Sequence, residues 1–362
     1  MPLTDDIYVP AVKWRQGEYQ ALLRLTDPAK GRIFPLITIP DVEYDFDDGT
    51  PKHTVHEHVE NFPTRYKQKW KTRPAWIDVD VKLHTGAMMS GASVYAFVFD
   101  ELRKFHAEAV PVAAIDYTPA IINVLATIVV SDKLGVCVRA RLEHLMLPDF
   151  PLRLVALLKR LKVDKEEVDL IIDLGTPAYE PYKIFSDALR VAIGKIPGLD
   201  VFRTFVLLGT AFPESLKDVV KPGGTVERHD WKFYCAFIMS LPANMRRPSY
   251  GDYTIVHPTF IANMDMRTIK PAGKLIYTAK GDWMVRKGGA FRSNPAQMHG
   301  HCDHVVKSGE FKGAAFSAGD DYIEKCAAKK ESCSTLTRWK EIGINHHIMH
   351  VLEDVAKLGG SP

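Results

Sequence analysis

The sequence predicts an α/β fold, an eight-stranded (β/α) barrel of the TIM type. Three observations lead to this prediction. Strand-like and helix-like segments alternate from about residue 33 to residue 257, as a series of strand–helix repeats requires. Two strand-like segments, residues 75–83 and 135–143, carry charged residues along one side. Neither a Gly-x-Gly-x-x-Gly turn nor a P-loop follows any strand, which favours the barrel over the alternative, an open doubly wound sheet.

Eight segments are expected to form the barrel strands. The fifth contains Leu170-Ile171-Ile172, an apolar run that is typical of a buried parallel strand. The seventh has the weakest pattern. The predicted strands cover residues 33–39, 75–83, 110–115, 136–142, 169–173, 202–208, 225–229 and 252–257.

Helix-like segments separate most of these strands. Residues 93–107 carry an apolar stripe at helical spacing. Thr118 is expected to cap the next helix, because Pro119 follows it at the first helical position. A short amphipathic helix is expected before the barrel, within residues 8–25. Further helices are expected at residues 152–161, 182–193, 214–220 and 231–241.

The strand–helix alternation stops near Lys274. The sequence then predicts a hairpin around Lys280-Gly281-Asp282, followed by helices at about residues 295–307, 320–328 and 336–358. No long flexible linker precedes this extension, and its own core would be thin. We therefore expect residues 1–273 to form the barrel, with its N-terminal helix, and residues 274–362 to pack on it.

The composition excludes several classes of protein. The net charge of +3 is small for 362 residues, so no broad nucleic-acid-binding surface is expected. The five cysteines are scattered and odd in number, which indicates free thiols in a reducing compartment. The first residues lack the pattern of a signal peptide, and no apolar run approaches the ~20 residues of a membrane helix. A cytoplasmic protein without membrane association is expected.

Charged residues are expected to line the barrel mouth, the end at which the carboxyl termini of the strands meet. In barrels of this type the residues at that end carry out the chemistry. Asp116 and Asp173 end two of the predicted strands. The inward sides of the strands at residues 75–83 and 135–143 add Asp78, Asp80, Lys82, Arg139, Arg141 and Glu143.

These residues suggest a site for an anionic, phosphorylated ligand, because a guanidinium forms two parallel hydrogen bonds to phosphate. We take Arg139, Arg141, Asp78 and Asp116 as ligand-binding residues. The candidate catalytic residues are Asp80, Lys82 and Asp173. Asp80 and Asp173 would act as general acid and base, or would hold a divalent cation. The alternative is an internal salt-bridge network with a purely structural role, and the pattern does not decide whether the protein is an enzyme.

Two histidine clusters lie in the C-terminal extension. Residues 299–304, with Cys326 or Cys333, suggest zinc, but their spacing fits no standard finger. A polar surface helix is the favoured interpretation, and no metal site is predicted. His346 and His347 are candidate ligand-binding residues, because a tail folded over the mouth would bring an imidazole to the ligand. The alternative is a helix that packs on the barrel wall.

Several short segments spread over nearly the whole chain carry a further signal. They are Tyr8-Val9-Pro10-Ala11 with residues 13–22, Pro35–Pro40, Asp169–Asp173, Tyr250–Tyr253 with His257-Pro258, Phe316-Ser317-x-Gly319-Asp320, and Trp339 with Gly343–His347. Together these segments resemble the Beta protein family of satellite phages and prophages.

The resemblance implies a component of an anti-phage cassette, in which the Beta protein accompanies a protein called Gop and a repressor-like partner. It implies no particular reaction. Similar sequences tend to carry Glu where this chain has Thr38, so a carboxylate on the first predicted strand is not expected here. A second function therefore stands beside ligand binding, a non-catalytic scaffold that regulates a toxic cassette partner by direct contact.

Overall fold

The structure, a computed structural model, describes residues 7–259 and 270–359. The chain divides into two compact units that interleave along the sequence. Unit 1 consists of residues 1–14, 33–210 and 229–252, and unit 2 of residues 15–32, 211–228 and 253–362. The predicted division into residues 1–273 and 274–362 stays a prediction.

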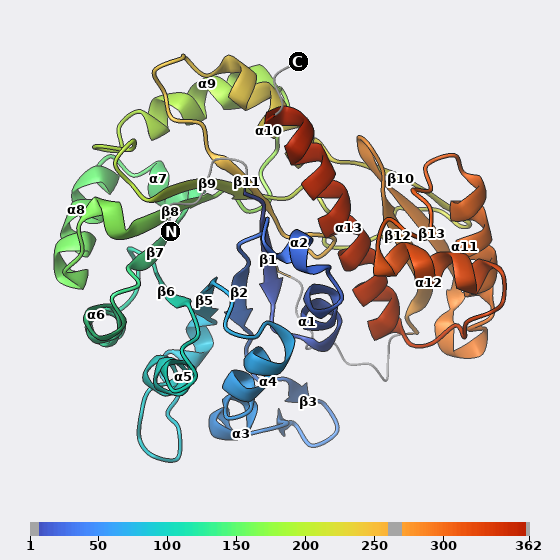
Figure 1. Ribbon diagram of the computed structural model, residues 1–362, viewed down its shortest axis with the longest axis horizontal. Coiled ribbons are helices and arrows are strands. Elements are labelled where there is room, and N and C mark those ends of the chain that lie inside the picture. The colour runs from blue at the N-terminus through green and yellow to red at the C-terminus, as the bar shows by residue number, and fades with distance from the viewer. Residues whose placement is uncertain (1–6, 260–269, 360–362) are drawn as a thin grey trace. The chain divides into compact units, whose positions relative to one another are not determined.

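Unit 1 contains a closed barrel of eight parallel strands, which confirms the predicted fold class (Figure 1). The order around the barrel is β1-β11-β9-β8-β7-β6-β5-β2, and the pairing of β1 with both β11 and β2 closes it. The strands are β1 (Val9–Lys13), β2 (Leu36–Ile39), β5 (Ala75–Val79), β6 (Ala109–Ala113), β7 (Val136–Arg141), β8 (Val168–Asp173), β9 (Thr204–Gly209) and β11 (Ser249–Asp252).

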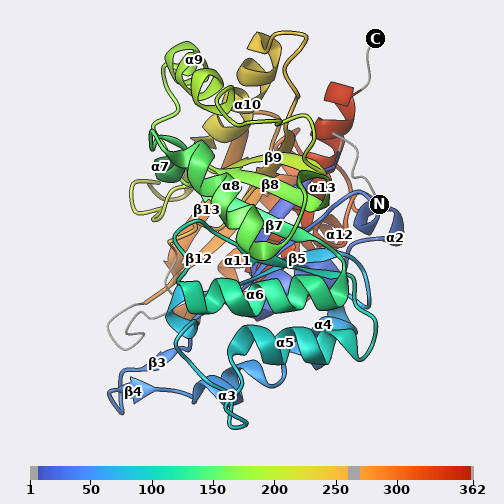
Figure 2. The same cartoon turned by 90° about the vertical axis from the view of Figure 1, so that its left-hand side faces the viewer.

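Helices cover the outside of the barrel, and Figure 2 shows α5 and α6 running alongside each other. Ser93 caps α5 and Thr118 caps α6, each by accepting a hydrogen bond from a backbone N–H three residues on. A small hairpin, β3 (Tyr44–Asp45) with β4 (Thr50–Pro51), follows β2. The helices of unit 1 are α3 (Val55–Val59), α4 (Phe62–Lys69), α5 (Val94–Arg103), α6 (Pro119–Asp132), α7 (Leu142–Leu145), α8 (Phe150–Leu161), α9 (Tyr182–Ile193) and α10 (His229–Ser240).

The N-terminal segment is the first correction to the predicted elements. A short helix was expected within residues 8–25, and α1 (Gln16–Leu23) lies there, but strand β1 precedes it and was not predicted. Val9-Pro10-Ala11-Val12 is apolar throughout, and such a short run does not show whether a segment is helix or strand. Pairing decides it, because β1 bridges β11 and β2. Tyr8, just before β1, donates a hydrogen bond to Asp252 of β11 at 2.6 Å.

The seventh predicted strand is the second correction. Residues 225–229 were expected in the barrel, but β10 (Gly223–Glu227) pairs antiparallel with β13 in unit 2. An alternation of apolar and polar residues is typical of any half-exposed strand, and it does not show with which strand that strand pairs. The barrel strand β11 also begins earlier than the predicted residues 252–257.

Unit 2 contains a three-stranded antiparallel sheet of order β10-β13-β12. The hairpin of β12 (Ala272–Thr278) and β13 (Asp282–Ala290) turns at residues 279–281, which confirms the predicted hairpin. The helices of unit 2 are α1, α2 (Asp27–Lys30), α11 (Gln297–Lys307), α12 (Ala318–Ala327) and α13 (Leu336–Gly359).

Helix α13 packs on α1, although more than 300 residues separate their sequences. The Asn345 side chain donates to the Ala21 carbonyl at 3.0 Å, and Lys340 lies 2.9 Å from Glu18. Glu18 is almost fully buried, so the ammonium of Lys340 compensates its charge.

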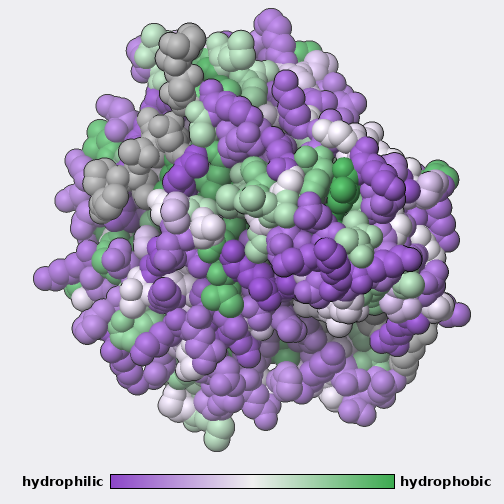
Figure 3. Space-filling model, turned by 45° about the vertical axis from the view of Figure 1, so that its right-hand side comes forward, coloured by the Kyte–Doolittle hydropathy of each residue, from purple (hydrophilic) through white to green (hydrophobic). Residues whose placement is uncertain are grey.

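The described helices include none that could span a bilayer, because none in residues 7–259 or 270–359 is long and apolar enough. The face shown in Figure 3 carries mainly hydrophilic side chains, with hydrophobic ones in small separate groups.

Candidate functional site

Two side chains of β5 point into the barrel. Trp76 Nε1 donates to Asp169 Oδ2 of β8 at 2.7 Å, and Asp78 Oδ2 lies 2.9 Å from Arg139 Nη1 of β7. Neither pair of strands is adjacent in the barrel, so both contacts cross its interior. The alternation along a strand then places Ile77 and Val79 on the outer side, beneath the helices.

Arg139 joins two buried carboxylates at the barrel mouth. Its Nη1 donates to Asp78, and its Nε and Nη2 donate to Asp173 Oδ2 at 2.9 and 2.6 Å. The side chains of Asp78 and Asp173 are 6% and 4% exposed, against 21% for the Arg139 side chain. We call Asp78, Arg139 and Asp173 the central network. The structure thus brings together three of the predicted site residues, from three different strands.

Two tyrosines complete the surroundings of Asp78. Tyr117 and Tyr95 donate their hydroxyl hydrogens to Asp78 Oδ1, at 2.8 and 3.2 Å. Burial raises the pKa of both phenols well above its usual value, and the adjacent Asp78 carboxylate raises each further. Both groups therefore remain hydrogen-bond donors at neutral pH.

Arg141 forms a second, more exposed network farther along β7. Its guanidinium lies 2.6 Å from Asp116 and 2.8 Å from Glu143. The three side chains are between 40% and 69% exposed. His144 packs against this group, and burial lowers the pKa of its imidazole. We call Arg141, Asp116, Glu143 and His144 the rim network.

Asp80 and Lys82 lie beyond the end of β5, so the prediction that both belong to this extended strand was wrong. Strand β5 ends at Val79, and Asp80 caps a 3₁₀ turn, Val81–Leu83, by accepting a hydrogen bond from the Lys82 backbone. The Lys82 side chain is 64% exposed and lies 3.1 Å from Asp41. The alternation of side chains holds only while the chain stays extended, and a capping aspartate ends it here. The two residues therefore lie outside both networks.

A second buried ion pair lies deeper in the barrel. Arg203 donates to both oxygens of Asp169, from Nε at 2.9 Å and from Nη2 at 2.5 Å, and Trp76 adds a third hydrogen bond. Cys137 is fully buried nearby, and burial raises the pKa of its thiol well above the usual value. The Arg203 side chain is 21% exposed and Asp169 is buried, and a paired, hydrogen-bonded charge of this kind is typical of a structural role.

His346 and His347 lie in the core of unit 2. His346 is bound on both sides, by Asp320 Oδ2 at Nδ1 and by the Thr278 carbonyl at Nε2, each at 2.9 Å. Its ring stacks on Tyr277 with centroids 3.8 Å apart. His347 Nδ1 lies 2.9 Å from the Thr278 hydroxyl. Both imidazoles are fully buried, and their role toward a ligand stays a prediction.

Sequence reasoning missed Tyr95, Tyr117 and Arg203. Tyr95 lies on a helix and was read as part of an apolar stripe, whereas Tyr117 follows Asp116 directly after a predicted strand. That position at the mouth was the available signal for Tyr117. Arg203 directly precedes β9, and no period in the sequence points to its partner.

A comparison with protein families now places the molecule. The profile of the Beta protein family matches residues 8–353. The chain belongs to the Beta protein family. The match includes residues of both units and all members of the central and rim networks. No curated protein matches the sequence.

Several of the sequence segments that resemble the Beta family take part in buried contacts of the structure. The phrase Asp169–Asp173 supplies both acids of β8, one to Arg203 and one to Arg139. Ser317 caps α12, and its hydroxyl donates to Asp320 Oδ2 at 2.5 Å. Gly319 lets α12 approach α13, because a Cβ there would lie 2.5 Å from the Ile342 carbonyl oxygen. The phrases thus mark buried polar contacts of this Beta family member.

Proposed function

We propose that this Beta family protein is a cytoplasmic component of an anti-phage cassette and that its barrel mouth binds a phosphorylated small molecule or nucleotide. The observation that supports the proposal is that Arg139 and Arg141 lie two residues apart, on the same side of β7. Carboxylates orient both guanidiniums at the carboxyl ends of the strands. A guanidinium fixed in this way loses little freedom when it binds phosphate.

Arg141 is the residue that the ligand would contact first on entering the barrel mouth. Its side chain is 45% exposed, and its partners Asp116 and Glu143 are themselves exposed. Exchanging an exposed carboxylate for a phosphate costs little, because exposed ion pairs contribute only ~0–1 kcal/mol. Arg139 is held more firmly, by two buried carboxylates, and would add charge beneath the bound anion.

Chemistry on the ligand would depend on Asp173. Of the three predicted catalytic residues, Asp173 belongs to the central network, whereas Asp80 and Lys82 lie beyond the end of β5. Asp80 and Asp173 also bind different partners, which weakens the proposal of a divalent cation held by both. Binding of the ligand therefore has more structural support than catalysis.

The second candidate function is a non-catalytic scaffold that regulates a toxic cassette partner by direct contact. It is favoured by the charge balance of the mouth. Four carboxylates in the two networks face two guanidiniums, so both arginines are already neutralised within the protein. A closed network of this kind is typical of a structural role.

A thermal-shift screen separates the two functions. Nucleotides and inorganic phosphates are added to the full chain with and without Mg²⁺ or Mn²⁺. We expect the ligand to raise the melting temperature of the wild type and of Arg153→Gln, a control on α8 with an exposed ion pair to Asp149, but not that of Arg141→Gln. No shift with any compound, together with co-purification of a cassette partner, would favour the scaffold.

A further inference from the structure

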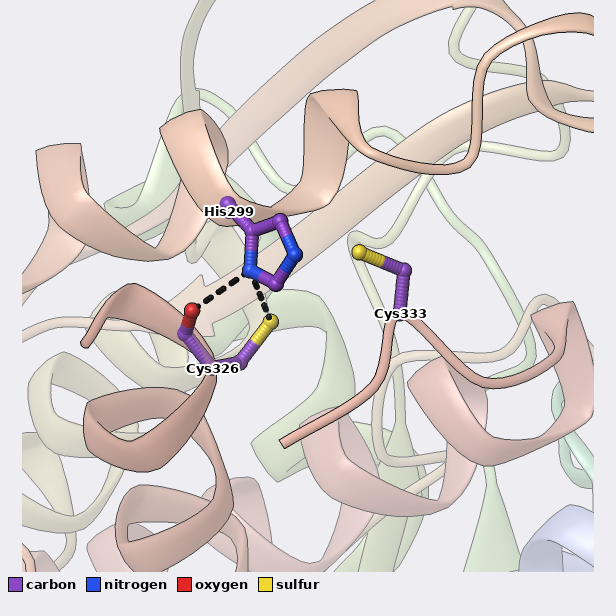
Figure 4. A group of neighbouring side chains, drawn as sticks. All are labelled: His299, Cys326 and Cys333. Carbon is purple, nitrogen blue, oxygen red and sulfur yellow. Dashed lines mark hydrogen bonds between the residues drawn. The ribbon is translucent and has the colours of Figure 1, made fainter. Parts of the chain in front are cut away.

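Imidazole and thiol groups converge in unit 2. His299 lies on α11, Cys326 in the last turn of α12, and Cys333 on the segment that leads to α13. One donor atom from each residue lies within 4.8 Å of the other two. Figure 4 shows the three side chains pointing toward one another from three separate segments. His299 Nδ1 and Cys326 Sγ are 3.5 Å apart.

Cys302 supplies a fourth donor. It follows His299 by three residues on α11, so both side chains lie on the same face of that helix. The Cys302 thiol is fully buried and hydrogen-bonds to the side chain of Cys326. All three cysteines belong to one buried cluster of unit 2. The imidazole of His299 and the thiols of Cys326 and Cys333 therefore lie close together, and the Cys302 thiol adjoins that of Cys326.

The hydrogen bond of His299 fixes which ring nitrogen would bind a metal. Nδ1 lies 2.6 Å from the backbone carbonyl oxygen of Cys326. A carbonyl oxygen only accepts hydrogen bonds, so Nδ1 carries the hydrogen and the lone pair of the neutral ring is on Nε2. Metal-ligating histidines commonly donate their other ring N–H to a backbone carbonyl in this way. The arrangement around His299 is thus one that a metal-binding imidazole requires.

The donor set selects the class of metal. Three thiolates and one imidazole are a common set for structural Zn²⁺, which takes four such ligands in a tetrahedron. With Zn–S bonds of ~2.3 Å and Zn–N bonds of ~2.0 Å, the ligand atoms would lie about 3.5–3.8 Å apart. One donor atom each from His299, Cys326 and Cys333 lies within 4.8 Å of the other two, so these three residues would move together by about 1 Å at most to reach that geometry.

Packing and disulfide formation explain the cluster less well. Buried cysteines are often inert small hydrophobic residues, but packing alone does not require an imidazole oriented beside three thiols. A disulfide would join two of the thiols at ~2.05 Å and leave the third, with the histidine, unused. All five cysteines of the chain are free thiols in the structure.

We propose that His299, Cys302, Cys326 and Cys333 bind one Zn²⁺ ion. The ion would join α11, the end of α12 and the segment before α13. All four positions would be filled by protein side chains in a largely buried setting, so the site would stabilise unit 2 and would not be catalytic. The spacing of two residues between His299 and Cys302, and of six between Cys326 and Cys333, fits no standard finger, which is why the sequence did not predict a metal site.

The first test measures zinc in the full chain, purified without a metal-affinity tag and desalted. We expect one zinc per chain. Replacing zinc by Co²⁺ should give the intense visible bands of a tetrahedral site and a thiolate-to-metal charge-transfer band in the ultraviolet. Absence of zinc after incubation with excess Zn²⁺, or a Co²⁺ spectrum without thiolate bands, would overturn the proposal. Both measurements use the wild-type protein, so they do not depend on the folding of a variant.

Variants identify the ligands. Cys326→Ser, Cys333→Ser and His299→Ala are expected to lose zinc. Two matched controls are expected to keep it: Cys235→Ser on α10 of unit 1, and His304→Ala on the exposed side of α11. Loss of zinc from either control to the same extent as from the ligand variants would contradict the assignment. So would mass-spectrometric detection of a disulfide among Cys302, Cys326 and Cys333 in freshly purified protein.

Discussion

Asp173 Oδ2 accepts two hydrogen bonds from Arg139, one from Nε at 2.9 Å and one from Nη2 at 2.6 Å. Both residues lie inside the barrel, on the neighbouring strands β7 and β8. The same guanidinium also binds Asp78, so one cation serves two buried acids. The stability of the barrel mouth therefore depends on Arg139 more than on either carboxylate.

Arg139→Met is expected to lower the free energy of unfolding by ~3–5 kcal/mol, because it leaves two buried carboxylates without their common guanidinium. Urea unfolding followed by circular dichroism measures the loss. The triple variant Asp78→Asn, Arg139→Met, Asp173→Asn removes all three charges and should recover most of it. A loss below ~1 kcal/mol in the single variant would show that the central network contributes little.

Arg141→Gln is expected to lower the free energy of unfolding by no more than ~1 kcal/mol, because its partners Asp116 and Glu143 are exposed and remain hydrated. The same urea experiment, run beside Arg139→Met, makes the comparison. Equal losses in the two variants would mean that the rim network is as tightly coupled to the fold as the central network. A small loss would leave Arg141 available for tests of ligand binding.

His350 is expected to make the protein less stable in acid. Burial, and then the nearby Arg228 charge, lower the pKa of this imidazole from 6.5 to about 2. Below pH 6.5 the unfolded chain binds a proton that the folded chain does not, so the stability contributed by the neutral ring is present above that pH and is lost as the pH falls toward 2. At pH 5 the loss is about 2 kcal/mol relative to pH 8.

His350→Leu tests this pH dependence, because leucine removes a ring whose two nitrogens have no hydrogen-bond partner. Urea unfolding at pH 8 and pH 5 should show a difference about 2 kcal/mol smaller for the variant than for the wild type. His304→Leu, on the exposed side of α11, should retain the wild-type difference. An unchanged difference in His350→Leu would place the acid sensitivity elsewhere.

Gly319→Ala is expected to destabilise unit 2 by ~1–3 kcal/mol, because the added methyl group would lie 2.5 Å from the Ile342 carbonyl oxygen and would separate α12 from α13. Gly300→Ala is the matched control on helix α11, where nothing lies within 4 Å of the new Cβ. The control should gain up to ~1 kcal/mol from helix propensity. Thermal unfolding of the two variants should therefore shift in opposite directions.

The sequence predicts the barrel well where strands are long and regular. The apolar run of β8 and the alternation along β5 and β7 led to the correct segments and to the inward orientation of Asp78, Arg139 and Asp173. It fails for β1, because five mostly apolar residues show no period, and for β10, because the pattern does not reveal which sheet a strand joins.

The candidate site is predictable only in part, for a related physical reason. Alternation gives the direction of a side chain while the backbone is extended, and it gave a wrong result for Lys82 once Asp80 began a turn. The contacts of Tyr117 with Asp78 and of His299 with Cys326 join residues 39 and 27 positions apart. Such contacts depend on how the segments pack, which no local period records.

The interleaving of the two units has a consequence for the order in which the protein is made. Strand β1 pairs with β11, so the barrel cannot close until residue 252 has left the ribosome. The packing of helix α1 is complete even later, because its partner α13 lies near the end of the chain. Through most of translation β1 therefore lacks one of its two neighbours, β11, and α1 lacks α13, which leaves apolar side chains such as Leu22 open to chaperones. A nascent chain released early, at residue 273 for example, would carry every barrel strand and still leave α1 uncovered.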